Sequence, residues 1–192
     1  MIYLIARCLS LFAGGIFFRL KVSGLIPGGG VILCSNHLSN CDPPIIATST
    51  FRKLHFMAKK ELFYNPVIAF FLKKLNAFPV DRNLFDRSAF RKAVEIVNSG
   101  KNLLVFPEGT RNKTGDGKVK KIRRAVSYII YRTEKPVIPV FIKGTNEWKE
   151  LKRFSVKFGK PVDFPERKMP YTREVSEKIC ERIKDGIEKT AR

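Results

Sequence analysis

The sequence predicts an α/β protein with a mixed, mostly parallel sheet that is flanked by helices. Short and nearly continuous apolar runs, such as residues 31–34 and 102–106, indicate strands buried on both faces, as in parallel sheets. Segments with helical periodicity lie between these runs, so strands and helices alternate along the chain. The 192 residues, of which 44% are hydrophobic, are enough for one domain with a substantial core.

Each element is expected from its own local pattern. The triplet Gly28-Gly29-Gly30 lacks the Lys and Ser/Thr of a phosphate loop, so we assign it to a turn. Pro139 should place its strand near a sheet edge or a bulge. The helix expected at 66–75 is apolar on most faces and ends in Lys73 and Lys74, so burial in the core and contact with a membrane are both open. Strands are expected at residues 31–34, 54–58, 102–106, 137–142 and 155–158, and helices at 43–50, 66–75, 86–98, 119–132 and 172–189.

The N-terminal residues 2–18 (IYLIARCLSLFAGGIFF) are mostly apolar. Arg7, near the middle, would be costly in a helix that crosses a bilayer, and the two adjacent glycines weaken a helix. We therefore expect residues 1–20 to form an interfacial, monotopic membrane-anchoring helix, with Arg7 reaching lipid phosphates. A soluble core helix is the alternative, because short apolar runs are ambiguous. Residues 21–192 should form the folded domain.

The charge of the chain predicts an anionic partner. Its 37 Lys and Arg residues against 17 Asp and Glu residues give a net charge of +20. Nucleic acid, an anionic membrane and phosphorylated substrates all fit this charge. The sequence has no zinc spacing and no RNP-type aromatic motif, and lipid explains the apolar N-terminus better, so we expect an anionic phospholipid membrane and no nucleic acid. Four cysteines without metal or disulfide spacing fit a reducing compartment, and no metal site is expected.

A candidate catalytic pair follows the first predicted strand. His37 is one of two histidines in the chain, and Asp42 is the fifth residue after it. An imidazole can take a proton from a hydroxyl, and a carboxylate on its other ring nitrogen fixes the tautomer and stabilises the imidazolium. The substrate hydroxyl can then attack directly, without a protein nucleophile. Two structural alternatives stay open: Asp42 as the N-cap of a helix that starts at Pro43, and a purely structural His37.

The pair is the first of four blocks that resemble one family. His37-x4-Asp42, followed by residues 106–111 (FPEGTR), resembles the glycerolipid acyltransferase family, and most closely its 1-acylglycerol-3-phosphate acyltransferases. Residues 77–82 (AFPVDR) and 137–140 (VIPV) match two further blocks, in the family's order. The hexapeptide together with the upstream histidine and aspartate is a specific signal, whereas either alone would be weaker.

The resemblance implies an activity. A member of this family moves a fatty acyl group from a thioester, acyl-CoA or acyl carrier protein, to the free hydroxyl of 1-acylglycerol 3-phosphate, which forms phosphatidic acid. No further cofactor is implied. The resemblance makes residues 21–192 an acyltransferase domain and places the protein at the cytoplasmic face of a membrane, as a peripheral or monotopic protein. Glycerol 3-phosphate or another lysophospholipid is the alternative acceptor.

The resemblance also implies substrate-binding positions. In the family the matching arginines and lysine lie near the acceptor phosphate, and the glutamate holds the acceptor's glycerol part and the shape of its loop. Solvated charge, a surface ion pair and a purely structural turn are the alternatives for Lys59, Arg82 and residues 106–111. The chain departs from the family at Ala125, where glycine is expected. The positions assigned to substrate binding are Asn36, Lys59, Arg82, Glu108, Gly109, Thr110, Arg111 and Arg123.

Overall fold

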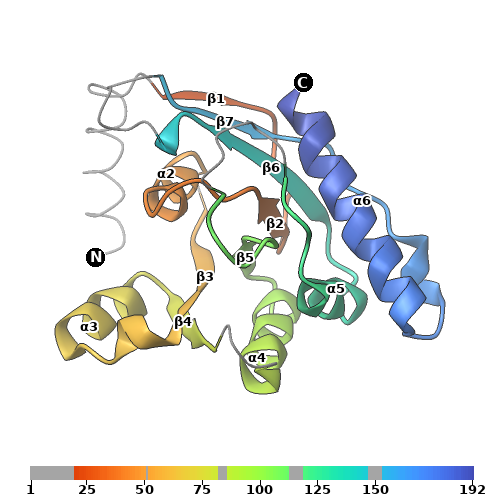
Figure 1. Cartoon of the computed structure of the whole chain (residues 1–192), viewed down its shortest axis with the longest axis horizontal. Coiled ribbons are helices and arrows are strands. Elements are labelled where there is room, and N and C mark those ends of the chain that lie inside the picture. The colour runs from red at the N-terminus through yellow and green to blue at the C-terminus, as the bar shows by residue number, and fades with distance from the viewer. Residues whose placement is uncertain (1–19, 51, 82–85, 113–118, 147–152) are drawn as a thin grey trace.

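A seven-stranded sheet forms the centre of the part of the chain that the structure describes (Figure 1). The computed structural model describes residues 20–50, 52–81, 86–112, 119–146 and 153–192. The strands are β1 (Lys21–Ser23), β2 (Ile32–Ser35), β3 (Leu54–Lys59), β4 (Ala77–Val80), β5 (Asn102–Val105), β6 (Val137–Lys143) and β7 (Ser155–Phe158). The helices are α2 (Asp42–Thr48), η1 (Lys60–Phe63), α3 (Pro66–Lys74), α4 (Arg87–Asn98), α5 (Arg124–Tyr131), η3 (Pro165–Lys168) and α6 (Arg173–Ala191).

The strand directions bring several loops to one edge of the sheet. The spatial order is β1-β7-β6-β2-β5-β3-β4, and every neighbouring pair is parallel except β6 and β7. This confirms the predicted mixed, mostly parallel sheet. Because β2, β3 and β5 run in the same direction, the residues that follow them lie at the same edge, where ligands bind in open α/β sheets.

Helices cover both faces of the sheet (Figure 1). Alternate strand residues point to opposite faces, so Ile32 and Cys34 pack with α4, α5 and α6, whereas Leu33 packs with α2. Helix α6 buries a stripe at steps of four residues, as predicted, and is capped by Thr172, whose hydroxyl accepts from the backbone N–H of Val175. The stripe consists of Val175, Ile179, Ile183 and Ile187.

Two expectations about individual elements were wrong. Residues 119–123 are not helical, because α5 begins at Arg124. Pro139 lies within the sheet and not near its edge, since β6 pairs with both β2 and β7. The carbonyl oxygen of Pro139 accepts from Gly159 N at 2.8 Å, and the N and O of one strand residue point to the same side. The nitrogen of Pro139 therefore points toward β7, at a position just beyond Phe158, the last residue of that strand. Because it points away from β2, its lack of a hydrogen breaks no bond between β6 and β2.

The predicted anchoring helix at residues 1–20 falls almost entirely outside the described residues, so it stays a prediction. Within the described ranges, no helix combines the length and the hydrophobicity that a bilayer crossing requires.

Candidate active site

The loop after β2 is held in place by its first side chain. The amide nitrogen of Asn36 donates to the carbonyl of Ile142 at 2.9 Å, and its amide oxygen accepts from Ile142 N at 2.8 Å. These two bonds pin the buried Asn36 to β6, on one side of β2. They give Asn36 the role of fixing where the next residue, His37, leaves the sheet. Direct contact of Asn36 with substrate stays a prediction.

His37 and Asp42 form the pair that their spacing predicts. His37 Nδ1 lies 2.8 Å from Asp42 Oδ2, and both side chains are buried. The same carboxylate oxygen accepts from the backbone N–H groups of Leu38 at 2.6 Å and Ser39 at 2.8 Å. The N-cap of α2 is Cys41, which makes no side-chain capping bond, so the capping alternative for Asp42 was wrong. The carboxylate bonds to the histidine and to the backbone of its loop, and it does not cap the helix.

The second oxygen of this carboxylate has a partner that the sequence did not reveal. Thr145 Oγ1 donates to Asp42 Oδ1 at 2.5 Å, and Thr145 is completely buried. Thr145 follows β6 and is 103 residues away from Asp42 along the chain. The only sequence signal is a hydroxyl residue just after a strand. The resulting set of donors holds the Asp42 carboxylate in one orientation.

Glu108 ties the FPEGTR loop to the histidine loop. Its Oε1 accepts from His37 N at 3.0 Å, and its Oε2 accepts from Lys120 N at 3.1 Å. Burial raises the pKa of the Glu108 carboxyl, and these hydrogen bonds offset only part of that effect. Glu108 therefore sets the shape of the loop, one of its two predicted roles. Its contact with the acceptor's glycerol part stays a prediction.

The imidazole of His37 is also held by packing. Its ring stacks on Phe106 with centroids 4.1 Å apart and planes 24° apart. The carbonyl of His37 accepts from Asn112 N at 2.6 Å. The ring is thus fixed through Nδ1, through its backbone and through one face, which leaves Nε2 as the nitrogen that can exchange a proton.

Arg123 lies against the glycine of the FPEGTR loop. Gly109 has φ +71°, and a Cβ built there would come 2.4 Å from Arg123 Nε, so only glycine fits beside this side chain. The backbone N–H of Arg123 donates to Pro107 O at 2.9 Å. Because the N–H of Arg123 bonds to Pro107, it does not make the bond to the carbonyl of Val119 that a helix beginning at residue 119 would need.

The remaining predicted positions are distributed around this centre. Thr110 and Arg111 are exposed on the same loop, and Lys120 Nζ donates to Arg111 O at 3.2 Å. Lys59 ends β3 at the same sheet edge, where its Nζ lies 2.9 Å from Glu61 Oε1. Arg82 lies outside the described residues. The structure thus joins His37 directly to Glu108, and it places Arg123 against Gly109 of the loop that carries Glu108. The substrate-binding roles of all the assigned positions stay predictions.

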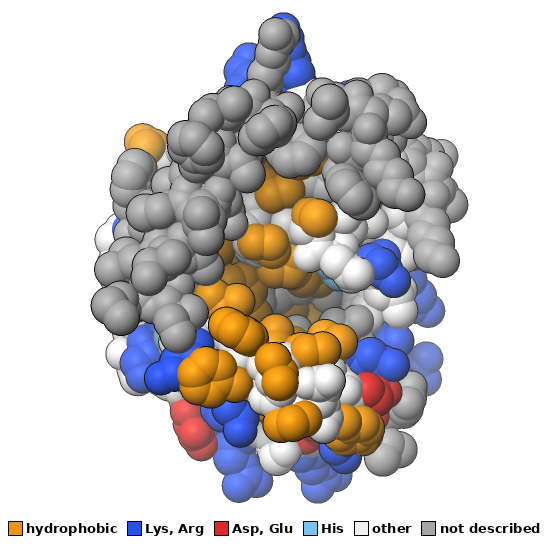
Figure 2. All heavy atoms as spheres, turned by 90° about the vertical axis from the view of Figure 1, so that its left-hand side faces the viewer, with side chains coloured by type: hydrophobic (Ala, Val, Ile, Leu, Met, Phe, Trp, Pro, Cys, Tyr) orange, Lys and Arg blue, Asp and Glu red, His pale blue; other side chains and the backbone are white. Residues whose placement is uncertain are grey.

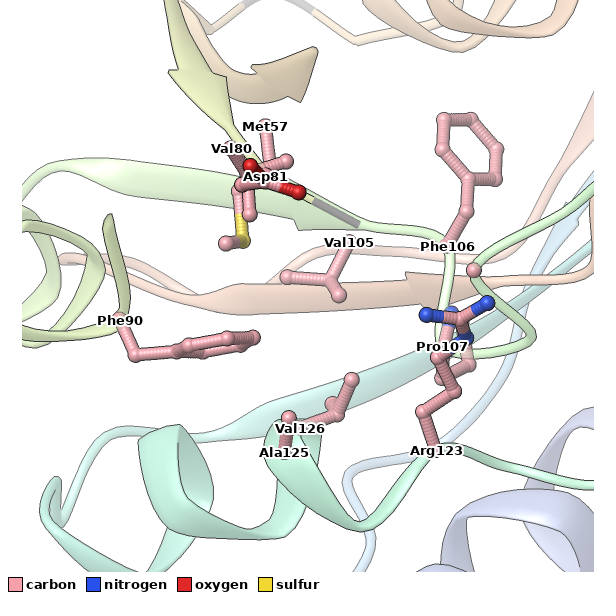
Figure 3. A pocket seen from close by; sticks show the side chains of 11 residues that line it. Met57, Val80, Asp81, Phe90, Val105, Phe106, Pro107, Arg123, Ala125 and Val126 are labelled. Carbon is pink, nitrogen blue, oxygen red and sulfur yellow. The ribbon is translucent and has the colours of Figure 1, made fainter. Parts of the chain in front are cut away.

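An apolar pocket of about 90 Å³ lies beside this loop, between the sheet and helices α4 and α5. Figure 3 shows Phe90, Val105 and Val126 pointing into it, with Arg123 rising from the start of α5 toward Pro107. Ala125, which stands where the family has glycine, is one of the lining residues. The methyl group therefore reduces the space at this point of the wall.

The other histidine has a different environment. His55 is half-buried in β3, and its Nδ1 lies 3.2 Å from the carbonyl of Asn102. Burial lowers its pKa. His55 is thus a packed strand histidine. Across the described segments, no group of His, Cys, Asp or Glu side chains could hold a metal ion.

Comparison with known proteins agrees with these features. The sequence profile of the acyltransferase family matches residues 19–143, well over half of the chain. The chain belongs to the acyltransferase family. The matched segment contains His37, Asp42 and the whole FPEGTR loop.

Individual members of the family are moderately similar to this chain. The 1-acyl-sn-glycerol-3-phosphate acyltransferase of Bacillus subtilis (strain 168) is 35% identical over 99 residues, which cover 52% of this chain and 48% of that protein. The enzyme of the same name from Streptococcus pneumoniae (strain ATCC BAA-255 / R6) is 30% identical over 142 residues, 71% of this chain and 52% of that protein. The chain thus matches about half the length of these two relatives.

A solved structure extends the similarity over nearly the whole chain. The crystal structure of the 1-acyl-sn-glycerophosphate (LPA) acyltransferase PlsC from Thermotoga maritima has a TM-score of 0.73 and 27% identity. The match covers 97% of this chain and 78% of that chain.

Proposed function

We propose that this acyltransferase moves a fatty acyl group from a thioester to the free hydroxyl of 1-acylglycerol 3-phosphate, which forms phosphatidic acid. The observation that carries the proposal is the 2.8 Å bond between His37 Nδ1 and Asp42 Oδ2, in a loop that Glu108 of the FPEGTR segment holds through His37 N. The activity for which the relatives from Bacillus subtilis, Streptococcus pneumoniae and Thermotoga maritima are named supports this acceptor.

The proposed reaction uses His37 as a general base. Asp42 accepts a hydrogen bond from the Nδ1–H of His37, so Nε2 is free to take the proton of the acceptor hydroxyl while the hydroxyl oxygen forms a bond to the thioester carbonyl carbon. The C–S bond then breaks, and the thiolate leaves with the proton that His37 returns. A positioned base contributes about 10²–10⁴-fold to such a reaction. Holding the hydroxyl against the thioester contributes more than that.

The proposed phosphate-binding surface is built from the cations beside the FPEGTR loop. Arg123 packs on Gly109, and Arg111 is exposed on the same loop. A guanidinium can pair with two phosphate oxygens at once, which suits a phosphomonoester. Arg82 is proposed from its motif alone. Lys59 would join this set by exchanging its bond to Glu61 for the phosphate.

The remaining parts of the proposal concern the donor and the location. We propose acyl-CoA or acyl carrier protein as the co-substrate, with no other cofactor, and the apolar pocket beside Phe106 as space for the first carbons of an acyl chain. The protein would bind an anionic phospholipid membrane from the cytoplasmic face as a peripheral or monotopic protein. The charge of +20 and the apolar residues 2–18 support this location.

The decisive test compares the two histidines. His37→Ala should lower acyl transfer to lysophosphatidate by about 10³-fold or more, because the group that takes the hydroxyl proton and returns it to the thiolate is lost. His55→Ala removes the other histidine, which lies in β3 without a carboxylate partner, and should keep near-normal turnover. Near-normal turnover of a folded His37→Ala protein would eliminate the proposed base.

The acceptor needs a separate experiment. The purified protein would be incubated with lysophosphatidate, glycerol 3-phosphate or lysophosphatidylcholine, each with acyl-CoA and with acyl carrier protein thioester, and the products would be identified by mass. We expect phosphatidate as the main product. A preference for glycerol 3-phosphate or for another lysolipid would keep the enzyme but replace the acceptor.

A further inference from the structure

Helix α3 and the short η1 before it expose large apolar side chains to solvent. The exposed fractions are 70% for Tyr64, 63% for Val67, 52% for Phe70 and 51% for Phe71. Leu62 and Ile68 are exposed as well. We call these six residues the α3 apolar surface. Scattered exposed apolar residues are ordinary, but six on two consecutive short elements form a patch that marks an interaction site.

The local sequence explains why this helix forms without being buried. Asn65 caps it, since its side-chain oxygen accepts from Val67 N and Ile68 N, and Pro66 occupies its first position. Asn76, at φ +63°, ends it in a left-handed turn. Of its nine residues only Ala69 is buried, whereas α4 buries five of twelve. The apolar side chains of α3 therefore contribute little to the core.

Lysines surround the apolar side chains. Lys59 and Lys60 lie at the start of η1, and Lys73 and Lys74 lie in the last turn of α3; all four are exposed. Lys74 Nζ is 5.6 Å from the centroid of the Phe70 ring, so its stem follows the apolar surface while its charge stays in water. The acidic residue in this stretch, Glu61, pairs with Lys59.

The patch lies on the same side of the molecule as a hollow in its surface. Figure 2 shows apolar side chains gathered along one margin of this hollow, with Lys and Arg side chains around the outside of the patch. Segment η1 begins where β3 ends, at the sheet edge that also carries the loops of His37 and Glu108. A partner that covers the patch would therefore also face the hollow.

We propose that η1 and α3 form a docking surface for an anionic lipid bilayer. Phe70, Phe71 and Val67 enter the boundary of headgroups and acyl chains, and the four lysines bind lipid phosphates. The inference deepens the proposed function, since it states which surface brings the site to a membrane-borne acceptor. A second copy of this chain fits the patch less well, because a symmetric contact would bring the same lysines together without an unpaired acid among these residues.

A tryptophan placed in the patch tests the inference directly. Trp148, the single tryptophan of the chain, is replaced by Phe, and Phe70→Trp or Met169→Trp is added. Met169 is a matched control, since it is 49% exposed but lies after η3, which packs beside α5 and α6. With vesicles that contain phosphatidylglycerol, the emission of the Phe70→Trp protein should move to shorter wavelength, and that of the control should not. An unshifted Phe70→Trp protein that floats with the vesicles would overturn the inference.

Vesicle flotation measures the contribution of the two kinds of side chain. Phe70→Ser/Phe71→Ser should weaken partitioning onto anionic vesicles by about tenfold or more, and Met169→Ser should not. Lys73→Gln/Lys74→Gln should weaken it at low salt, whereas the exposed pair Lys178→Gln/Lys189→Gln on α6 should have a smaller effect. Equal losses in both lysine pairs would mean non-specific attraction and would overturn the proposed surface. So would a dimer that depends on Phe70 and Phe71 without vesicles.

Activity assays separate this inference from the proposed function. The Phe70→Ser/Phe71→Ser protein should retain turnover of detergent-dispersed lysophosphatidate and lose it on vesicles. If the Phe70→Trp protein shifts its emission on vesicles but neither it nor the wild type acylates a lysolipid, the function is refuted and the docking surface stays in place. Equal turnover of the double variant and the wild type on vesicles would refute the docking surface alone.

Discussion

The site around His37 and the α3 apolar surface depart from the usual distribution of side chains in opposite ways. At the site, the polar side chains of Asp42, Thr145 and Glu108 are buried, with Asp42 and Thr145 fully so. On α3, Phe70 and Phe71 are about half exposed. A buried polar group and an exposed apolar group each cost free energy unless a partner compensates, so each departure calls for an explanation.

The difference lies in where the partner is. Each buried carboxylate at the site finds its partners within the chain: backbone N–H groups, the Nδ1 of His37 and the hydroxyl of Thr145. The site is therefore organised before substrate arrives, which is what positioning of a base requires. The α3 surface has no such compensation among the described residues. In the proposed docking its partner is a bilayer outside the chain, and loss of that partner should not affect the fold.

The largest expected effect comes from removing the centre of the buried network. Asp42→Ala leaves two backbone N–H groups and the hydroxyl of Thr145 without their acceptor, at about 1–3 kcal/mol each, so the free energy of unfolding should fall by at least about 3 kcal/mol. Turnover should fall by about 10³-fold or more, because the carboxylate that fixes the tautomer and orientation of His37 is lost. Urea unfolding measures the change in stability, and an acyl-transfer assay measures the change in turnover. Asp185→Ala, on the exposed part of α6, is the control, and equal behaviour of both variants would contradict the network.

A second prediction concerns Thr145, which belongs to the same buried network around Asp42. Thr145→Val keeps the shape but removes the bond to Asp42 Oδ1, so kcat should fall about tenfold while KM for lysophosphatidate changes little. Thr145→Ser restores the hydroxyl and should recover most of kcat. If Thr145→Val lowers stability but leaves kcat and its pH profile unchanged, Thr145 is structural and not a positioning residue.

These two residues also show how far sequence could reach. The pair of His37 and Asp42 was predictable because both lie in one short loop after one strand, so local spacing determines their contact. Thr145 was not, since its contact with Asp42 depends on β6 lying beside β2, a long-range pairing that no local pattern encodes. The same limit explains Pro139, whose edge position was inferred from its missing N–H without knowledge of where β7 ends.

The non-helical residues 119–123 and the exposed α3 are further cases. The apolar and basic residues before α5 fit a helix. In the structure, however, the backbone N–H groups of Lys120 and Arg123 bond to Glu108 and Pro107, which belong to the FPEGTR loop and not to the same local segment. For α3, an apolar helix with terminal lysines has the same composition whether it is buried or faces a membrane. Whether such a helix is buried depends on the elements packed around it, and in α3 only Ala69 is buried.

Glu108 provides a smaller, pH-dependent effect. Burial raises its pKa in the folded state, so the folded protein binds this proton more tightly than the unfolded chain does. The stability that this adds is complete below the ordinary carboxyl pKa and is lost as pH rises through the folded-state value. Glu108→Gln removes the titration. The difference in unfolding free energy, wild type minus variant, should therefore decrease as pH rises above the ordinary carboxyl pKa. A difference that grows with pH would contradict the direction of the shift.

The smallest expected effect is on the other side of the comparison. Because Phe70 and Phe71 are half exposed, Phe70→Ser/Phe71→Ser should change the free energy of unfolding by no more than about 0.5 kcal/mol per site in the absence of lipid. Phe90→Ser, on the buried face of α4, is the matched aromatic control and should cost about 3–5 kcal/mol. Urea unfolding without vesicles distinguishes the two. A loss for the α3 pair as large as that for Phe90 would mean that α3 packs on the body in solution, and the apolar side chains would then need no external partner to explain them.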